Sequence, residues 1–284
     1  MSQTPHNNDV KFAIWSIAIV VIALVAIIFI KISSNNSSNN APAVATVAPA
    51  ALIAKLSSLS AGAFEQVGIG TATKLPVPLK SAPALVKDGL PHIVYIGAEY
   101  CPFCAAERWP VVIALLRFGT FSGLGLAKSA DKPEGFPNTA TLSFHGATYT
   151  SKYLSFTGIE ETTSERNASG GYTALDTPSA DIQQLLTTYD AAPYVPASAA
   201  GSIPFIDFGG KYLSTGSSFD PGVLQDKTAD QIAGAMADTS SSISKGAVGA
   251  SNTITAALCT LTGNQPTSVC SSPMIQGLQA KLGN

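Results

Sequence analysis

Apolar residues are distributed unevenly along the chain, and their densest run lies at residues 12–30. This run has neither a charged residue nor proline, and it is long enough to cross a bilayer as a helix. A cleaved signal peptide is the alternative, because alanine-rich sites follow at residues 41–51. The run is longer than the apolar part of a usual signal peptide, so we expect an uncleaved single-pass transmembrane anchor.

The anchor divides the rest of the chain. Residues 1–11 are expected to form a short cytoplasmic tail, and residues 31–50 a flexible linker of Ser/Asn followed by Ala/Pro. Residues 51–284 then form the folded domain, placed outside the cytoplasm. The flanking lysines do not settle this orientation, but the polar linker and the cysteine content favour it.

Within the domain, the clearest local patterns alternate between helix and strand. Residues 52–59 read as a short helix, and the apolar, β-branched residues 92–97 as a buried central strand. A helical pattern covers residues 101–118, with a kink or break expected at Pro110. A strand is expected at residues 121–127. This mixture predicts an α/β fold.

The second half of the chain continues the alternation. Residues 139–144 and 149–159 alternate apolar and polar positions as strands do, with a turn at His145-Gly146, while residues 164–177 read as loop. Thr177-Pro178 starts a helix through residue 189, and a Pro/Ala loop follows at residues 191–201. Two short strands around Gly209-Gly210 predict a hairpin over residues 203–213, and helices follow from residue 230.

The low charge of the chain argues mainly against one class of partner, nucleic acid. Charged residues make up 12% of the chain and the net charge is −2, so there is no basic field to attract nucleic acid. We therefore expect a weakly charged, exported surface and no nucleic-acid partner.

The chain has 4 cysteines: Cys101, Cys104, Cys259 and Cys270. An even count in an exported domain suggests two disulfides. They can pair in three ways, and closure of each pair of sequence neighbours is the simplest.

Cys101 and Cys104 have the position that redox chemistry requires. They form a Cys-X-X-Cys between an expected strand and an expected helix. A helix N-terminus favours a thiolate through its unpaired N–H groups and partial positive charge. Haem attachment needs a histidine after the second cysteine, but Ala105 stands there. A zinc site would need Cys259 and Cys270 as further ligands, and their separation is wide for one, so we expect no metal.

Two motifs resemble those of thioredoxin-like proteins. Residues 98–101, Ala-Glu-Tyr-Cys, look like the thioredoxin lead-in, and residues 101–104, Cys-Pro-Phe-Cys, are similar to glutaredoxins and to disulfide-introducing periplasmic oxidoreductases. Residues 201–205, Gly-Ser-Ile-Pro-Phe, resemble the cis-proline strand of that fold, which lies against the Cys-X-X-Cys. The chain also resembles an uncharacterised archaeal family of membrane-anchored proteins with this cysteine motif.

The resemblance implies a thioredoxin-like mixed sheet with flanking helices, an insertion at about residues 119–200 and a helical C-terminal part. Thioredoxin has a buried acid in the strand before the motif, whereas this chain has Tyr95 there. That acid assists proton transfer from the second cysteine, so the substitution argues against a fast general reductase.

The motif residues have distinct expected roles. Cys101 attacks or is attacked, and Cys104 resolves the mixed disulfide. Pro204 holds its loop and keeps an N–H donor away from the sulfurs. Ile203 offers backbone groups for strand-like pairing with a partner, and Phe103 is positioned to contact substrate.

Other candidate residues have a simpler interpretation. Glu99 and Glu107 are near enough in sequence to tune the thiolate, but solvated surface charge is the favoured interpretation. His92 and His145 are expected to pack or lie at the surface rather than bind a ligand. Cys259 and Cys270 are expected to form a structural disulfide worth about 3 kcal/mol. A second redox pair that relays electrons is the alternative.

Together these observations predict a membrane-anchored thiol–disulfide oxidoreductase that acts on exported proteins. An oxidase or isomerase is mildly favoured over a reductase. No NAD or flavin motif is visible, so no cofactor is expected, and a membrane redox partner must supply or accept electrons. The alternative is a non-enzymatic accessory subunit that uses the same surface to bind a membrane or envelope complex.

Overall fold

Strand β4 (Leu90–Gly97) is the centre of the fold, as the apolar pattern predicts. The computed structural model describes residues 45–132 and 134–283, which belong to one compact unit. β4 pairs antiparallel with β12 (Phe205–Phe208) and parallel with β9 (Ser155–Glu160). At its N-terminal end β4 also pairs with β3 (Val86–Lys87), and the sheet continues from β12 through β13 (Tyr212–Thr215) to β2 (Val77–Pro78). The sheet is therefore mixed.

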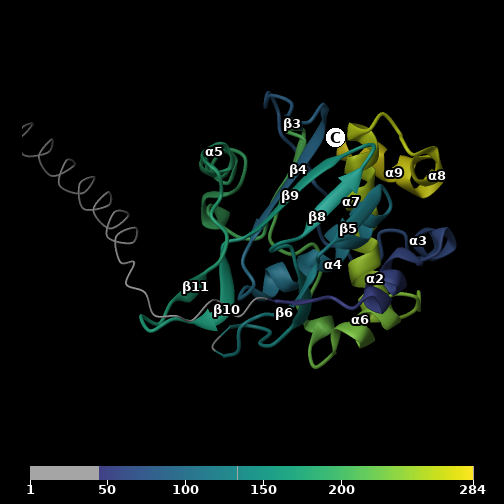
Figure 1. Ribbon diagram of the computed structural model, residues 1–284. Coiled ribbons are helices and arrows are strands. Elements are labelled where there is room, and N and C mark those ends of the chain that lie inside the picture. Colours follow the sequence, from purple (N-terminus) through teal and green to yellow (C-terminus); the bar gives the residue numbers. More distant parts are fainter. Residues whose placement is uncertain (1–44, 133, 284) are drawn as a thin grey trace, which may run out of the picture. The chain divides into compact units, whose positions relative to one another are not determined.

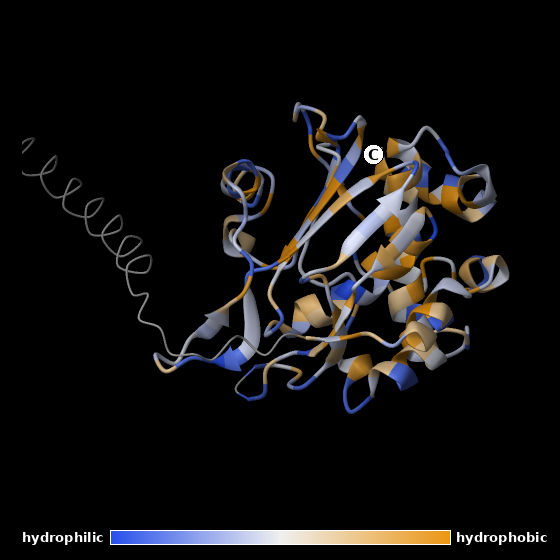
Figure 2. Cartoon of the chain, in the orientation of Figure 1, coloured by the Kyte–Doolittle hydropathy of each residue, from blue (hydrophilic) through white to orange (hydrophobic). Residues whose placement is uncertain are grey.

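Successive side chains of β4 enter two different cores. Ile93 and Tyr95 belong to the larger core, whereas Val94 and Ile96 belong to the smaller one. The larger core contains α4 (Pro102–Leu116) and α7 (Gly249–Leu261), and the smaller one contains α5 (Ala180–Tyr189). Figure 1 shows α5 on one side of β4 and β9 and the other two helices on the opposite side. Because both faces are covered, β4 is hydrophobic along most of its length (Figure 2).

Helix α4 is buried almost all round. From Pro102 to Leu115 only Phe103 is exposed. The break expected at Pro110 is absent, because the helix continues through this residue. Two hydrogen bonds join the helix to β7 (Ala140–Ser143): the Trp109 indole donates to the Ala140 carbonyl, and the Thr141 hydroxyl donates to the Ala105 carbonyl. Tertiary packing thus outweighs the lost helical hydrogen bond.

A long antiparallel ribbon follows α4. Its outer part pairs β6 (Gly125–Lys128) with β7, and its inner part pairs β5 (Gly119–Ser122) with β8 (Thr148–Ser151). The expected strand at 121–127 is therefore split at Gly123. The turn at His145-Gly146 exists, but it does not join a hairpin, since the strands on either side pair with β5 and β6 instead. The range 149–159 likewise divides into β8 and β9.

The region expected as an insertion divides into two kinds of structure. The hairpin β10 (Thr162–Arg166) and β11 (Tyr172–Ala174) lies at the periphery, and the ribbon packs against α4 through the buried strand β7, whereas β9 lies in the central sheet and α5 packs on it. Residues 164–177, expected as loop, thus contain strand residues. α5 agrees with the expected helix, and the loop after it contains only a short 3₁₀ turn, η1 (Ala197–Ala199).

The predicted hairpin and C-terminal helices are confirmed. β12 and β13 flank Gly209 and Gly210, both at positive φ. The turn η2 (Pro221–Leu224) and helix α6 (Ala229–Ala235) follow. A π-helical turn, η3 (Ser244–Val248), leads into α7, and the short helices α8 (Thr267–Cys270) and α9 (Pro273–Leu282) end the described chain.

Ordered structure begins before the expected start at residue 51. Strand β1 (Thr46–Val47) pairs with β6, and Ala48 is buried, so this end of the expected linker is held by backbone hydrogen bonds. Helices α2 (Ala50–Ser57) and α3 (Ala61–Val67) follow, and α2 agrees with the helix expected at 52–59. The expected tail, anchor and most of the linker lie outside the described residues. Within residues 45–132 and 134–283, none of the helices has the length and apolarity needed to span a membrane.

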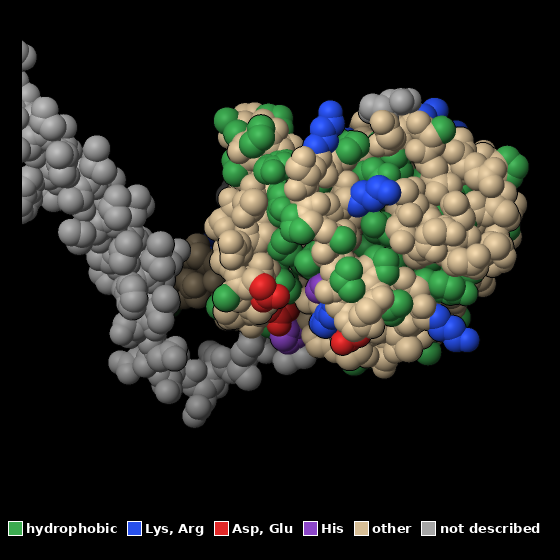
Figure 3. All heavy atoms as spheres, turned by 90° about the horizontal axis from the view of Figure 1, so that it is seen from above, with side chains coloured by type: hydrophobic (Ala, Val, Ile, Leu, Met, Phe, Trp, Pro, Cys, Tyr) green, Lys and Arg blue, Asp and Glu red, His purple; other side chains and the backbone are tan. Residues whose placement is uncertain are grey.

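The face in Figure 3 agrees with the low charge of the chain. Charged side chains are few and scattered there, between larger areas of uncharged polar surface and hydrophobic side chains.

Candidate functional site

Cys101 and Cys104 lie where strand β4 passes into helix α4. Cys101 is the N-cap residue of α4, and its Sγ accepts a hydrogen bond of 3.3 Å from the backbone N–H of Cys104. The short loop from Gly97 fixes this position, since the N–H of Cys101 also bonds to the Ala98 carbonyl. Both cysteines are free thiols; Cys101 is 5% exposed and Cys104 is 0% exposed. Any exchange with a partner therefore starts at Cys101.

The loop before β12 lies against Cys101. The register pairs Phe205 with Ile96, which places Pro204 beside the end of β4. The Ile203–Pro204 peptide bond is cis, and the Ile203 carbonyl lies 3.7 Å from the Cys101 Sγ. The structure thus brings together residues that are about a hundred positions apart in the sequence.

Aromatic side chains surround the motif. Phe103 is 44% exposed, although its helix is otherwise buried as far as Leu115, and its ring meets that of Phe136 edge to face. Tyr100 stacks on Tyr172 from β11 at a centroid distance of 4.1 Å. Phe103 is therefore accessible to a partner beside Cys101.

The two thiols differ in their acidity. A hydrogen bond from the Cys104 thiol, outweighing burial, lowers the pKa of Cys101 below its usual value. Backbone N–H groups at the helix start and the Arg108 charge act in the same direction. Burial raises the pKa of Cys104 well above its usual value. The pair is therefore set up as one thiolate, Cys101, supported by one thiol, Cys104.

A buried ion pair lies next to the thiols, and the sequence interpretation did not anticipate it. Arg108 Nε and Nη2 donate to the two carboxylate oxygens of Glu160 at 2.7 and 2.5 Å, and both side chains are fully buried. Nη2 also donates to the Ala98 carbonyl at 2.7 Å. The available signal was a charged residue four positions after Cys104 in an apolar helix, since such a residue needs a buried partner.

The surface interpretation of Glu99 and Glu107 is wrong, because both side chains are buried. Glu99 accepts a hydrogen bond from the Ser143 hydroxyl, and Glu107 accepts two from the backbone N–H and hydroxyl of Ser218. Burial raises the pKa of Glu107 to about 7. Sequence neighbours alone did not reveal this, because both serines come from distant segments.

His92 and His145 have partners other than the cysteines. The His92 ring is within 2.8 Å of the Thr157 hydroxyl, and burial lowers its pKa to about 4. His145 Nδ1 is 2.6 Å from an Asp176 oxygen. In the described part of the chain, no group of three or more His, Cys, Asp or Glu residues is arranged to hold a metal ion.

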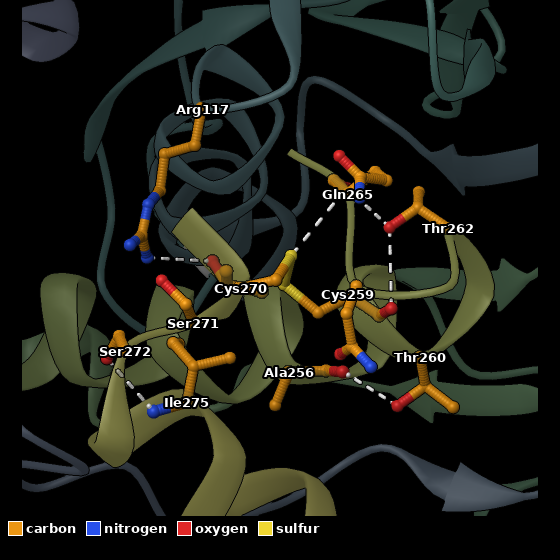
Figure 4. The surroundings of a disulfide bond; sticks show 12 residues. Arg117, Ala256, Cys259, Thr260, Thr262, Gln265, Cys270, Ser271, Ser272 and Ile275 are labelled. Carbon is orange, nitrogen blue, oxygen red and sulfur yellow. Dashed lines mark hydrogen bonds between the residues drawn. A yellow bond between two sulfur atoms is a disulfide. The ribbon is translucent and has the colours of Figure 1, made fainter. Parts of the chain in front are cut away.

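Cys259 and Cys270 are joined by a disulfide that links α7 to α8 (Figure 4). Both residues are fully buried. Leu261, at the end of α7, lies against Gly209 in the β12–β13 turn, whereas Cys101 lies near Pro204 at the opposite end of β12. β12 is about 13 Å long. The disulfide is thus too far from Cys101 for direct exchange, and its cysteines are not free to bind zinc.

Comparison with known proteins gives a family but no activity. No curated protein and no solved structure matches the chain. Residues 80–260 match a family described as a domain of unknown function, and this range contains Cys101, Cys104 and Pro204. The chain therefore belongs to the family of the domain of unknown function DUF929.

Proposed function

We propose that the chain is a membrane-anchored thiol–disulfide oxidoreductase that exchanges disulfides with exported proteins. The observation that carries the proposal is the position of Cys101: it caps α4, has a lowered pKa and lies against the cis-proline loop. An inert disulfide needs none of these features. A cross-link between residues three apart would also constrain the unfolded chain little.

The arrangement of elements supports a thioredoxin-like fold. β4, α4 and the parallel strand β9 are followed by α5, the antiparallel hairpin β12–β13 and α7, with the sheet order β9-β4-β12-β13. This is the order expected of a thioredoxin-like core, with the ribbon β5–β8 and the hairpin β10–β11 as additions. The weakly charged surface and the apolar run at 12–30 support an anchored, extracytoplasmic location.

The proposed reaction proceeds through a mixed disulfide. In the oxidising direction, a substrate thiolate attacks Cys101 Sγ, the Cys101–Cys104 bond breaks, and its electron pair goes to Cys104 Sγ. A second thiolate of the substrate then attacks the substrate sulfur that is bonded to Cys101, and this releases the Cys101 thiolate. The substrate is oxidised and the cysteine pair is reduced by two electrons. A membrane redox partner must reoxidise the pair, and the reverse sequence gives a reductase.

The reduction potential of the Cys101–Cys104 pair tests the proposal. The full-length protein is equilibrated in thiol/disulfide buffers, and alkylated cysteines are counted by mass spectrometry. A value near about −120 mV indicates a disulfide donor, and one near about −270 mV a reductase. Alkylation must be confined to Cys101 and Cys104, with Cys259 and Cys270 protected as a control. A pair that never exchanges would favour the non-enzymatic accessory subunit instead.

A further inference from the structure

Arg108 lies one helical turn after Cys104, on the same side of α4. Both side chains are fully buried. Arg108 uses Nε and Nη2 to bind Glu160 and the Ala98 carbonyl, but its Nη1 has no hydrogen-bond partner. A buried, unpaired donor on a charged group is costly, and natural proteins seldom leave one without a reason.

A second unpaired donor lies in the same region. The hydroxyl of Tyr95 on β4 is buried without a partner, and it lies so close to Gly97 that a Cβ there would be 2.6 Å from it. Tyr95 interacts electrostatically with Arg108, Cys104 and Glu160. Burial raises its pKa well above the usual value, so the hydroxyl keeps its proton and acts as a donor.

Disulfide exchange requires charge at this buried position. Whenever the Cys101–Cys104 bond is broken by a substrate thiolate, the electron pair goes to Cys104 Sγ. In the reverse direction, Cys104 attacks Cys101 Sγ and its proton ends on the released substrate thiol. Cys104 is therefore a thiolate in either direction, although burial strongly disfavours its charge.

We propose that Arg108, held in place by Glu160, stabilises the thiolate of Cys104, with the Tyr95 hydroxyl as a second donor. This inference rests on the proposed oxidoreductase function. The thioredoxin resemblance leads one to expect a buried acid at the position of Tyr95, where it assists proton transfer from the second cysteine. Here Arg108 instead favours the deprotonated cysteine through its charge. The unpaired Nη1 is then the donor reserved for the thiolate.

The other ionisable groups around Cys104 do not provide this charge. Those that interact with Cys104 come from the motif loop, α4 and β4, and are Tyr100, Cys101, Arg108 and Tyr95. Beside them lie four acids: Glu160 and Glu99 on the side of Arg108, and Glu134 and Glu161 on the side of Tyr100. Among these described groups Arg108 is the cation. Although burial opposes its charge, the Glu160 carboxylate raises the pKa of Arg108 above its usual value, so it stays charged.

Arginine suits this position better than lysine. The guanidinium has five N–H donors in a fixed plane, so two nitrogens can bind Glu160 and Ala98 while the third faces elsewhere. Glu160 is fixed in turn by the backbone N–H of Phe144 at 3.3 Å. The orientation of Arg108 is thus set before any partner binds.

The two steps can be measured separately in the full-length protein. Dithiodipyridine reacts with reduced Cys101, which releases one thiopyridone and leaves a mixed disulfide. Attack by Cys104 on Cys101 Sγ then releases a second thiopyridone and forms the Cys101–Cys104 disulfide. The pH dependence of the second release gives the apparent pKa of Cys104, while the first release reports Cys101.

Two charge variants should shift the apparent pKa of Cys104 in opposite directions. In Arg108→Met/Glu160→Gln, which removes both charges together, the apparent pKa of Cys104 rises by about one unit or more, and the second release at neutral pH slows about tenfold. Glu160→Gln alone removes only the opposing charge, so the apparent pKa falls. Glu107→Gln replaces another buried acid, which lies on α4; it is the matched control and leaves the second release unchanged.

Several results would overturn the inference. One is a folded Arg108→Met/Glu160→Gln variant whose second release has the wild-type pH profile. Another is a shift of this profile in the same direction in the double variant and in Glu160→Gln, which a merely structural role would produce. If the double variant does not fold, Glu160→Gln alone decides. Charge stabilisation requires the apparent pKa of Cys104 to fall in this variant, so a folded Glu160→Gln protein with an unchanged or higher apparent pKa would contradict it.

The same experiment separates this inference from the proposed function. A wild-type protein that releases no second thiopyridone contradicts the oxidoreductase function itself. A wild-type protein that completes both steps, with a profile independent of Arg108, contradicts only the role of Arg108.

Discussion

Cys101 and Cys104 are three residues apart, yet their environments shift their pKa values in opposite directions. Cys101 caps α4, where N–H groups and the Cys104 thiol donate to it. Cys104 is one turn inside the helix and fully buried, so its charge is disfavoured. The difference comes from helix geometry and burial, and under the proposed function it makes Cys101 the sulfur that meets a partner.

Glu107 provides a prediction for stability at the scale of one residue. Burial raises its pKa from 4.5 to about 7. At pH values between these two pKa values, the folded protein therefore keeps a proton that the unfolded chain has lost. Because the folded state then holds more protons, this group makes the free energy of unfolding fall as pH rises, by about 2 kcal/mol between about pH 5 and about pH 7. Glu107→Gln should remove this part of the pH dependence, as measured by urea unfolding.

The comparison with wild type isolates Glu107. Burial also raises the pKa of Asp190 and of Asp207 to about 6, but both remain in the variant and contribute equally to the two proteins. Parallel plots of unfolding free energy against pH for wild type and Glu107→Gln would show that the buried carboxyl does not titrate in this range.

At the scale of elements, α4 shows how packing overrides a local signal. Pro110 predicts an interruption, but hydrogen bonds join the helix to β7 and nearly all of its residues are buried. The same burial requires partners for the helix's charged residues, and Ser218 and Glu160 provide them from distant segments. A helix pattern therefore predicts where α4 is, but not what surrounds it.

The disulfide between Cys259 and Cys270 gives a prediction about the C-terminal helices. It closes a sequence separation of 11 residues, so Cys259→Ala/Cys270→Ala should lower the free energy of unfolding by about 3 kcal/mol through added freedom of the unfolded chain. Urea unfolding under conditions that keep Cys101 and Cys104 reduced measures the loss.

A second double variant controls for the lost sulfur atoms. Cys101→Ala/Cys104→Ala also replaces two buried cysteines, but it removes no cross-link and should cost clearly less. Equal losses in the two variants would mean that packing, rather than the cross-link, accounts for the effect.

At the scale of the whole molecule, apolar cores on both faces of the sheet account for the fold, and electrostatics contribute little outside the site. Charged residues are 12% of the chain. Of the ion pairs among described residues, Lys55–Asp230 and Arg166–Glu134 are at the surface, where such pairs contribute little. Arg108–Glu160 is buried, so dissolved salt screens this pair only weakly.

Stability should therefore be nearly independent of ionic strength. Between about 0.05 M and about 0.5 M sodium chloride, we expect the thermal midpoint to move by less than about 2 °C. Differential scanning calorimetry measures this, and potassium chloride in place of sodium chloride separates screening from specific ion binding. A drop of many degrees would mean that surface ion pairs hold the fold together.

Local patterns predicted several elements because they depend on neighbouring residues. The apolar run of β4, the helical pattern of α4 and α5 and the glycine turn of β12–β13 are each encoded within a short segment. The errors lie where pairing is non-local. β9 looked like a part of an insertion, but it pairs in parallel with β4 across some sixty residues. Register between distant strands is not visible in local periodicity.

The sequence by itself determined that Cys101 begins a helix after a buried strand, since strand, motif and helix are contiguous. It also contained Pro204 in a segment that resembles a cis-proline loop. Only the tertiary structure decided that this loop meets Cys101, that Glu99 and Glu107 are buried, and that Arg108 has Glu160 as its partner. The physical reason is that burial and ion pairing depend on segments brought together by folding, whereas helix and turn signals act within a few residues.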